Sequence, residues 1–401
     1  MDVAVVAFLV AAVIIILGFL GEEFFKRTSI PDPLLLLLLG VLMGPIFQFF
    51  AQDELLAITP YFSALALIII LFDGGLNMKI REAVKNSPRA LIMALMGWTL
   101  NVLITAALCK VFLGWRLLNG LLLGSIVGGG SSLIVIALTR KLGVNEEVET
   151  LLSLESILTD VLCTVGAFAA INIILSGEIS LEVALSSVGI AFSVGILVGL
   201  GFGVIWLFAL EKLKGKPNAY MLTLAVLFLT YVVATLLGGS GAISALFLGL
   251  IIGNNGSIAK LFKFRTTVSV DEHVRDFHCQ ISFLIRSFFF VFTGLLFTFS
   301  SFSSVLFGLL LTFAFLGIRF IIIKITTLKS NLHPVETLMT IMFPRGLAAA
   351  VLASLPLTMG IPDSELFPEI SFIVILSSIL VTTIGVVFLK KRTKPSRYEY
   401  N

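Results

Sequence analysis

Thirteen apolar intervals, separated by shorter polar stretches, run through the chain. Most of them are close to the roughly 20 residues that an α-helix needs to cross a bilayer. The pattern therefore predicts an all-α polytopic membrane protein with thirteen transmembrane helices. We expect these helices near residues 3–20, 33–50, 58–76, 89–112, 117–138, 150–175, 181–210, 219–237, 241–253, 280–299, 301–328, 335–358 and 367–389.

The basic residues between these intervals predict an orientation. If the N-terminus lies outside and the C-terminus in the cytoplasm, 22 of the 27 Lys and Arg residues fall on the inner side. The outer side then holds only Lys110 and Arg116. Because membrane proteins concentrate Lys and Arg in cytoplasmic loops, we expect a multi-pass protein of the cell membrane in this orientation.

Two short motifs recur seven helices apart. Residues 37–44 read Leu-Leu-Leu-Gly-Val-Leu-Met-Gly, and residues 246–253 read Leu-Phe-Leu-Gly-Leu-Ile-Ile-Gly. Similarly, Phe-Asp-Gly-Gly-Leu at 72–76 matches Phe-Thr-Gly-Leu-Leu at 292–296. Since seven is odd, the two copies enter the membrane from opposite sides. We therefore expect an inverted repeat of helices 1–6 and 8–13, which is typical of secondary transporters.

The fifth and twelfth helices contain residues that weaken a helix. These helix-breaking residues are Gly128, Gly129 and Gly130 in the fifth helix, and Pro344 and Gly346 in the twelfth. Interruptions at corresponding places in two halves indicate a transport site, so we expect crossed discontinuous helices 5 and 12. Freed carbonyl groups near Gly129 or Ser131 would then bind a cation. The alternative for the three glycines is close helix packing.

The sixth interval, 150–175, carries two acids inside a membrane span. A charge at the bilayer centre costs ~2.5–3.5 kcal/mol, so such residues usually mark a site. Glu155 and Thr159 are four residues apart, as are Ser156 and Asp160, so each pair shares a helix face. Oxygen atoms of this kind suit a hard cation or a proton. A buried structural ion pair is the alternative.

Composition excludes a soluble globule. The chain of 401 residues is 58% hydrophobic and 13% charged, whereas soluble domains are about 25% charged. Three arginines inside the intervals oppose three acids, and we expect mutual neutralisation. The arginines are Arg286, Arg319 and Arg345, and the acids are Asp73, Glu155 and Asp160.

An enzyme is not expected. Residues 238–241, Gly-Gly-Ser-Gly, resemble the serine motif of intramembrane proteases, which need a general base. The three histidines, His273, His278 and His333, fall in predicted loops, so the spans supply none. We expect no cofactor, no resident metal, no disulfide and no nucleic-acid partner, and the lipid bilayer as the surroundings.

Together, the motifs resemble those of the monovalent cation/proton antiporters, particularly the NhaP-type sodium/proton antiporters related to animal sodium/hydrogen exchangers. The resemblance extends over nearly the whole chain and depends on residues 72–76, 155–160, 239–249 and 345–348. It implies a homodimer in which a core domain, about 58–175 and 280–389, moves against a dimerisation part. That part would be about 1–50 and 181–253.

The resemblance also implies roles for individual residues. Asp160 would bind the cation and the proton by turns, and Ser156 and Ser131 would help to coordinate the cation. Asp73 would contribute to the site. Glu155 would pair with Arg345 to hold the crossed helices.

Two departures from the family pattern bear on the transported ion and on stoichiometry. Thr159 stands where this branch usually has Asn, a change that bears on ion preference. The chain also lacks the adjacent pair of aspartates of electrogenic members, which bears on stoichiometry. Arg286 stands roughly where electrogenic relatives have Lys, and arginine does not give up its proton. We therefore expect electroneutral exchange of one proton for one sodium or lithium ion. The alternatives are potassium/proton or anion transport on the same scaffold, and a cation channel or uniporter.

Overall fold

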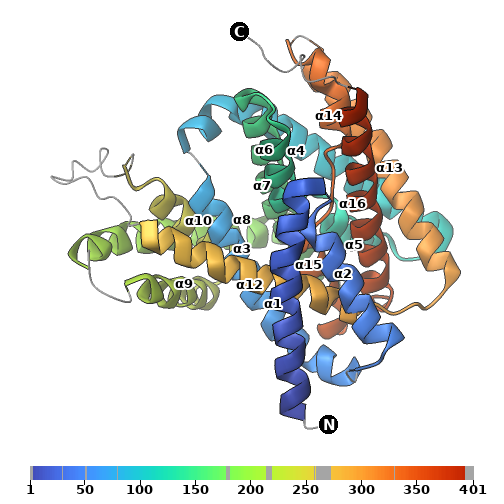
Figure 1. The fold of residues 1–401 in the computed structure, drawn as a ribbon, viewed down its shortest axis with the longest axis horizontal. Coiled ribbons are helices and arrows are strands. Elements are labelled where there is room, and N and C mark those ends of the chain that lie inside the picture. Colours follow the sequence, from blue (N-terminus) through green and yellow to red (C-terminus); the bar gives the residue numbers. More distant parts are fainter. Residues whose placement is uncertain are drawn as a thin grey trace. The chain divides into compact units, whose positions relative to one another are not determined.

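In a computed structural model of the chain, every regular element among the described residues is a helix (Figure 1). The structure describes residues 3–28, 30–49, 52–78, 80–177, 181–213, 219–256, 258, 272–328 and 330–392. The predicted all-α class is confirmed for these residues.

Helices cover each of the thirteen expected intervals. The continuous ones are α1 (Val3–Thr28), α3 (Gln52–Asn77), α7 (Glu146–Ser176), α8 (Leu181–Lys212), α9 (Ala219–Leu236), α10 (Gly241–Gly253), α12 (Glu272–Leu295), α13 (Phe302–Thr327) and α16 (Phe367–Arg392). Two helices continue into a π-helical turn, namely α2 (Asp32–Val41) into η1 (Leu42–Ile46) and α4 (Ile80–Leu108) into η2 (Cys109–Leu113).

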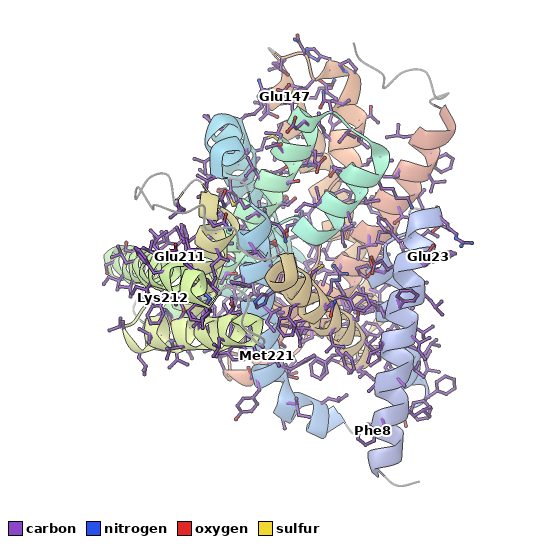
Figure 2. The ribbon with its side chains drawn as sticks, turned by 60° about the vertical axis from the view of Figure 1, so that its left-hand side comes forward. Phe8, Glu23, Glu147, Glu211, Lys212 and Met221 are labelled. Carbon is purple, nitrogen blue, oxygen red and sulfur yellow. The ribbon has the colours of Figure 1, made fainter. Side chains whose placement is uncertain are left out.

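Long apolar helices with exposed apolar side chains agree with a membrane protein. Within the described residues, seven helices are long and apolar enough to cross a membrane, and further apolar helices are shorter. Large apolar side chains project from them, such as Phe8 of α1 and Met221 of α9, which are 77% and 52% exposed (Figure 2). Such exposure suits contact with lipid rather than water. The number of crossings stays a prediction.

The two remaining intervals are interrupted helices. The first consists of α5 (Leu117–Val127) and α6 (Ser132–Leu142), with an unwound stretch at 128–131 between them. The second consists of η3 (His333–Val335), α14 (Glu336–Ile341) and α15 (Leu347–Thr358), with an unwound stretch at 342–346. Glycine lowers helix stability and proline removes a backbone donor, so the breaks fall where the sequence is weakest.

The two unwound stretches touch each other. The backbone N–H of Ser131 donates a hydrogen bond of 2.7 Å to the carbonyl oxygen of Pro344. A side chain at Gly346 would overlap the Ser131 hydroxyl, so this approach requires glycine. The contact brings together two segments that are more than 200 residues apart in the sequence.

The chain divides into two compact units. The first comprises Met1–Ser63, Asn86–Ser176 and Ser287–Asn401, and the second comprises Ala64–Lys85 and Gly177–Arg286. In the first, Leu122 and Phe343 belong to one buried apolar cluster, and in the second Phe72 and Leu248 belong to another. The assignment of a core and a dimerisation part stays a prediction.

In each unit, two helices cross closely at the glycines of the recurring motifs. In the first unit, Gly40 of α2 lies against the backbone of α12 near Gly294. In the second unit, Gly249 of α10 lies against the backbone of α3 at Phe72, and Gly75 lies against α10. A methyl group at any of these four glycines would overlap backbone atoms of the partner helix. The recurring glycine motifs therefore form the tightest helix contacts in their units.

The predicted loop position of the histidines is wrong for His278. It lies within α12, only 2% exposed, with its ring centroid 4.9 Å from that of Phe72. The helix begins at Glu272, before the apolar interval at 280–299. Its first two turns contain charged residues, so a search for apolar runs does not find them. His273 is also in α12, but its side chain lies outside the described residues.

Candidate functional site

The predicted central acid, Asp160, lies next to the first helix interruption. It is partly exposed, and its carboxylate accepts a hydrogen bond of 2.7 Å from the hydroxyl of Ser132. Ser132 is the first residue of α6, so the carboxylate lies at a helix N-terminus. Unpaired N–H groups there favour a negative charge. This end of α6 therefore supplies hydrogen-bond donors to the Asp160 carboxylate.

Thr159 holds the unwound stretch rather than the Asp160 carboxylate, and Ser156 anchors Thr159 within α7. The Thr159 hydroxyl accepts a hydrogen bond of 3.0 Å from the Gly130 N–H and donates one of 2.9 Å to the Ser156 carbonyl oxygen. Both side chains are buried. Threonine at this position thus ties the middle of α7 to the backbone of the interruption.

The Gly128 carbonyl group receives two hydrogen bonds from distant segments, one from a helix and one from the second unwound stretch. The Asn101 amide of α4 and the Arg345 guanidinium both donate to it, each at 2.8 Å. The Arg345 guanidinium also lies 4.7 Å from the centre of the Phe315 ring. The backbone N–H of Arg345 donates to the Ser378 hydroxyl at 2.9 Å. These contacts join both interruptions to α4, α13 and α16.

The expected Glu155–Arg345 pair is wrong, because Glu155 forms its ion pair with Arg319 of α13. Arg319 also donates from Nε to the Met339 carbonyl oxygen at 3.1 Å. Both charged side chains are buried, at 8% and 10% exposure for Glu155 and Arg319. The Arg345 guanidinium instead donates to the Gly128 carbonyl oxygen and lies over the Phe315 ring. Neutralisation of the buried charges therefore follows a different pairing.

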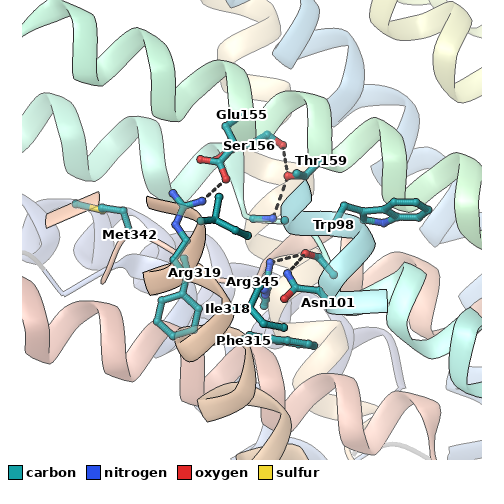
Figure 3. A pocket seen from close by; sticks show the side chains of 15 residues that line it. Trp98, Asn101, Glu155, Ser156, Thr159, Phe315, Ile318, Arg319, Met342 and Arg345 are labelled. Atoms are coloured by element: carbon teal, nitrogen blue, oxygen red, sulfur yellow. Dashed lines mark hydrogen bonds and ion pairs between the residues drawn. The ribbon is translucent and has the colours of Figure 1, made fainter. Parts of the chain in front are cut away.

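A small cavity of about 30 Å³ connects these groups (Figure 3). Among the residues that line it are Asn101, Gly128, Glu155, Ser156, Arg319 and Arg345. Figure 3 shows Asn101 and Arg345 converging on one oxygen atom, with the Glu155–Arg319 pair nearby. Asp160 is not one of the lining residues. The cavity is thus formed by the groups that hold the interruption.

Two predicted residues belong to the second unit. Asp73 of α3 accepts a hydrogen bond of 3.1 Å from the side chain of Asn77, one helical turn further on. Arg286 of α12 is partly buried, and its guanidinium lies 5.9 Å from the centre of the Phe283 ring. The proposed parts of Asp73 and Arg286 in ion binding stay predictions.

Four buried polar residues within the expected intervals are not among the residues predicted from the sequence. Asn101 lies in the middle of an apolar interval, which is itself a signal, and Ser132 adjoins the glycine run. The count of three intramembrane acids was incomplete, since Glu336 and Glu369 also fall within the expected intervals and are buried. Glu336 contacts Lys324, Thr327 and His333, and Glu369 accepts a hydrogen bond of 3.1 Å from the Ser300 N–H.

The whole sequence was compared with models of known protein families. A model described as "Sodium/hydrogen exchanger, transmembrane" matches residues 8–391. The chain belongs to the sodium/hydrogen exchanger family. The match confirms the resemblance that the motifs indicated, and it spans both units of this exchanger-family chain.

Curated relatives of this exchanger-family chain are longer than it is. The K(+)/H(+) antiporter NhaP2 of Shewanella sp. (strain ANA-3) is 30% identical over 398 residues, which are 93% of this chain and 64% of that protein. The Na(+)/H(+) antiporter ApNhaP of Aphanothece halophytica is 29% identical over 278 residues, 68% of this chain and 50% of that protein. The chain thus spans less than two thirds of these relatives.

The fold is similar to that of a solved structure. The sodium proton antiporter MjNhaP1 from Methanocaldococcus jannaschii matches with a TM-score of 0.81 over 96% of this chain and 99% of that chain. The two sequences are 22% identical. The likeness therefore establishes a shared fold.

Proposed function

We propose that this protein is a secondary active antiporter that exchanges a monovalent cation for a proton at Asp160. The observation that carries the proposal is the place of this acid. Asp160 accepts a hydrogen bond from the first residue after one helix interruption, and that interruption contacts a second one. Secondary transporters bind their ions where discontinuous helices meet. Membership of the exchanger family supports the same activity.

Competition for one carboxylate couples the two fluxes. Asp160 takes either a proton or a cation, and the loaded site is then close to neutral. The empty, anionic site does not cross the apolar barrier, because a charge in such surroundings is costly. Exchange is therefore obligatory. Ser131, Ser132, Ser156 and Thr159 are proposed to supply further oxygen ligands, and Asp73 to contribute.

Sodium is the proposed cation, with lithium as a second substrate. The name of the Aphanothece relative supports sodium. Potassium is the alternative, favoured by the K(+)/H(+) name of the Shewanella relative, which is similar over more of this chain. Both ions fit a site of one carboxylate and neutral oxygen atoms, so the choice depends on the spacing of these ligands.

The proposed stoichiometry is one proton for one cation. Thr159 next to Asp160 adds a hydroxyl group and no second carboxylate. Arg286 keeps its charge at ordinary pH and does not carry a proton. Transport in proteoliposomes is therefore expected to generate no membrane potential.

The proposed architecture has thirteen transmembrane helices in an inverted repeat, with crossed discontinuous helices 5 and 12. The sequence motifs match α2 to α10 and α3 to α12. The glycine crossings support this symmetry, since α2 packs on α12 and α10 packs on α3. A core that moves against the dimerisation part of a homodimer would give alternating access. We place the protein in the cell membrane with its C-terminus in the cytoplasm.

A flux measurement tests the proposed function. The purified protein is reconstituted with a trapped pH dye, and sodium, lithium, potassium and chloride salts are added in turn, each at zero membrane potential. Cation-dependent proton movement in the wild type, absent in Asp160→Asn that still inserts, is the expected result. Chloride-dependent movement, or cation flux without proton flux, would instead indicate an anion transporter or a channel.

A further inference from the structure

Asn101 is a buried polar side chain in the middle of α4. It is 5% exposed, and its amide donates a hydrogen bond of 2.8 Å to the Gly128 carbonyl oxygen. We propose that Asn101 is a positioning residue that fixes the unwound stretch 128–131 so that its oxygen atoms are placed to bind the cation with Asp160. This inference rests on the proposed exchange function and adds a residue of α4 to it.

The Gly128 carbonyl group needs partners because α5 ends at Val127. The last carbonyl groups of a helix have no partner within the helix. A carbonyl oxygen has two lone pairs, and here Asn101 and Arg345 donate to it, one each (Figure 3). Loss of the Asn101 amide leaves one lone pair of the Gly128 oxygen without a donor. The start of the stretch is then held by the Arg345 side chain.

The Asn101 amide is carried on a rigid element. The Thr105 hydroxyl donates to the Asn101 carbonyl oxygen at 2.7 Å, within α4. Gly124 of α5 lies so close to the backbone of Val102 that a methyl group there would clash with it. Trp98 donates from its indole to the Ser125 carbonyl oxygen at 3.4 Å. Contacts on both sides of Asn101 thus fix α4 on α5, and the amide has a defined place.

Gly128 lies only four residues before Ser132, which donates to the Asp160 carboxylate, so a displacement at Gly128 changes the surroundings of that carboxylate. The Gly130 N–H is held by Thr159, the Ser131 N–H donates to Pro344, and the next residue donates to Asp160. A cation needs several oxygen ligands at set distances, whereas a proton needs one oxygen atom. A shifted stretch therefore weakens cation binding and leaves proton binding to Asp160 intact.

The test compares two buried asparagines. Asn101→Leu removes the donor to Gly128, and Asn119→Leu removes a similar one, because Asn119 is 2% exposed and donates to the Pro362 carbonyl oxygen at 2.9 Å. Asn119→Leu is the control for the structural cost of losing a buried amide. The apparent KM for the cation, the maximal rate and the pH of half-maximal exchange are measured in proteoliposomes at equal protein content.

We expect Asn101→Leu to raise the KM about fivefold, the size of one lost hydrogen bond, and to keep the maximal rate within about twofold. Half-maximal activity moves to higher pH, since the cation competes less well with protons. A KM and pH profile equal to those of Asn119→Leu overturns the inference. Asn101→Ser, which is too short to reach Gly128, gives the same readout if the leucine variant does not insert. A wild type without cation/proton exchange overturns both this inference and the proposed function.

Discussion

Replacing Glu155 by glutamine removes one charge from the buried ion pair and leaves the other in place. Arg319 then keeps the Met339 carbonyl group as a hydrogen-bond partner and loses its carboxylate. A glutamine side chain has nearly the same size as that of glutamate, so packing changes little. The variant therefore isolates the effect of an uncompensated buried charge on stability.

The magnitude follows from burial. The two side chains are only 8% and 10% exposed, so solvent and salt screen the pair weakly. Breaking a buried pair in this way costs about 3–5 kcal/mol. The matched control lies on the same helix, where Glu147 pairs with Arg89 at 3.4 Å and the side chains are 54% and 37% exposed. Glu147→Gln is expected to cost about 0.2–1 kcal/mol.

Reversible unfolding in mixed detergent micelles measures both costs, and cation-dependent exchange measures the apparent KM. We expect Glu155→Gln to lose several times more stability than Glu147→Gln and to keep the KM within about twofold. The double variant Glu155→Leu, Arg319→Met should recover much of the loss, because no isolated charge remains. Full stability of Glu155→Gln together with lost cation binding would refute this reasoning and make Glu155 an ion ligand.

Three further predictions concern the site, the helix crossings and the stoichiometry. Ser132→Ala should raise the KM for the cation about tenfold, because Asp160 loses a charge-assisted hydrogen bond. Ser131→Ala should raise the KM less. Equal effects of the two substitutions would argue against the placement of Ser132. Gly249→Ala should lower the free energy of unfolding by about 3 kcal/mol, because the methyl group meets the α3 backbone. Gly201→Ala should not lower it, because a methyl group there has no neighbour within 4 Å. Equal melting temperatures of the two variants would contradict the close crossing. A voltage-sensitive dye should report no potential during exchange, and a current that scales with the sodium gradient would exclude one-for-one exchange.

Local sequence signals predicted much of the secondary structure. Apolar length located the helices, and the glycine run and Pro344 located the two interruptions, because these residues act on their own backbone. The helix ends were less predictable. Helix α12 begins at Glu272 within an amphipathic segment, which places His278 inside the helix rather than in a loop.

Partners between distant segments could not be predicted in this way. Glu155 had three arginines available in the sequence, and only the fold selects Arg319 and directs Arg345 to the Gly128 carbonyl group. Asn101 illustrates the same limit, since its polar character within an apolar span was visible, but its acceptor lies 27 residues away on another helix. Such choices depend on tertiary packing, which local patterns do not encode.

The number of protons released when a cation binds to the purified protein tests most directly whether Asp160 is shared between the two ions. Titration calorimetry in buffers of different ionisation enthalpy gives this number. We expect release that approaches one proton per protomer as the pH is lowered, and no release from Asp160→Asn. Wild-type protein that binds the cation without releasing protons at any pH at which it stays folded would contradict a shared carboxylate.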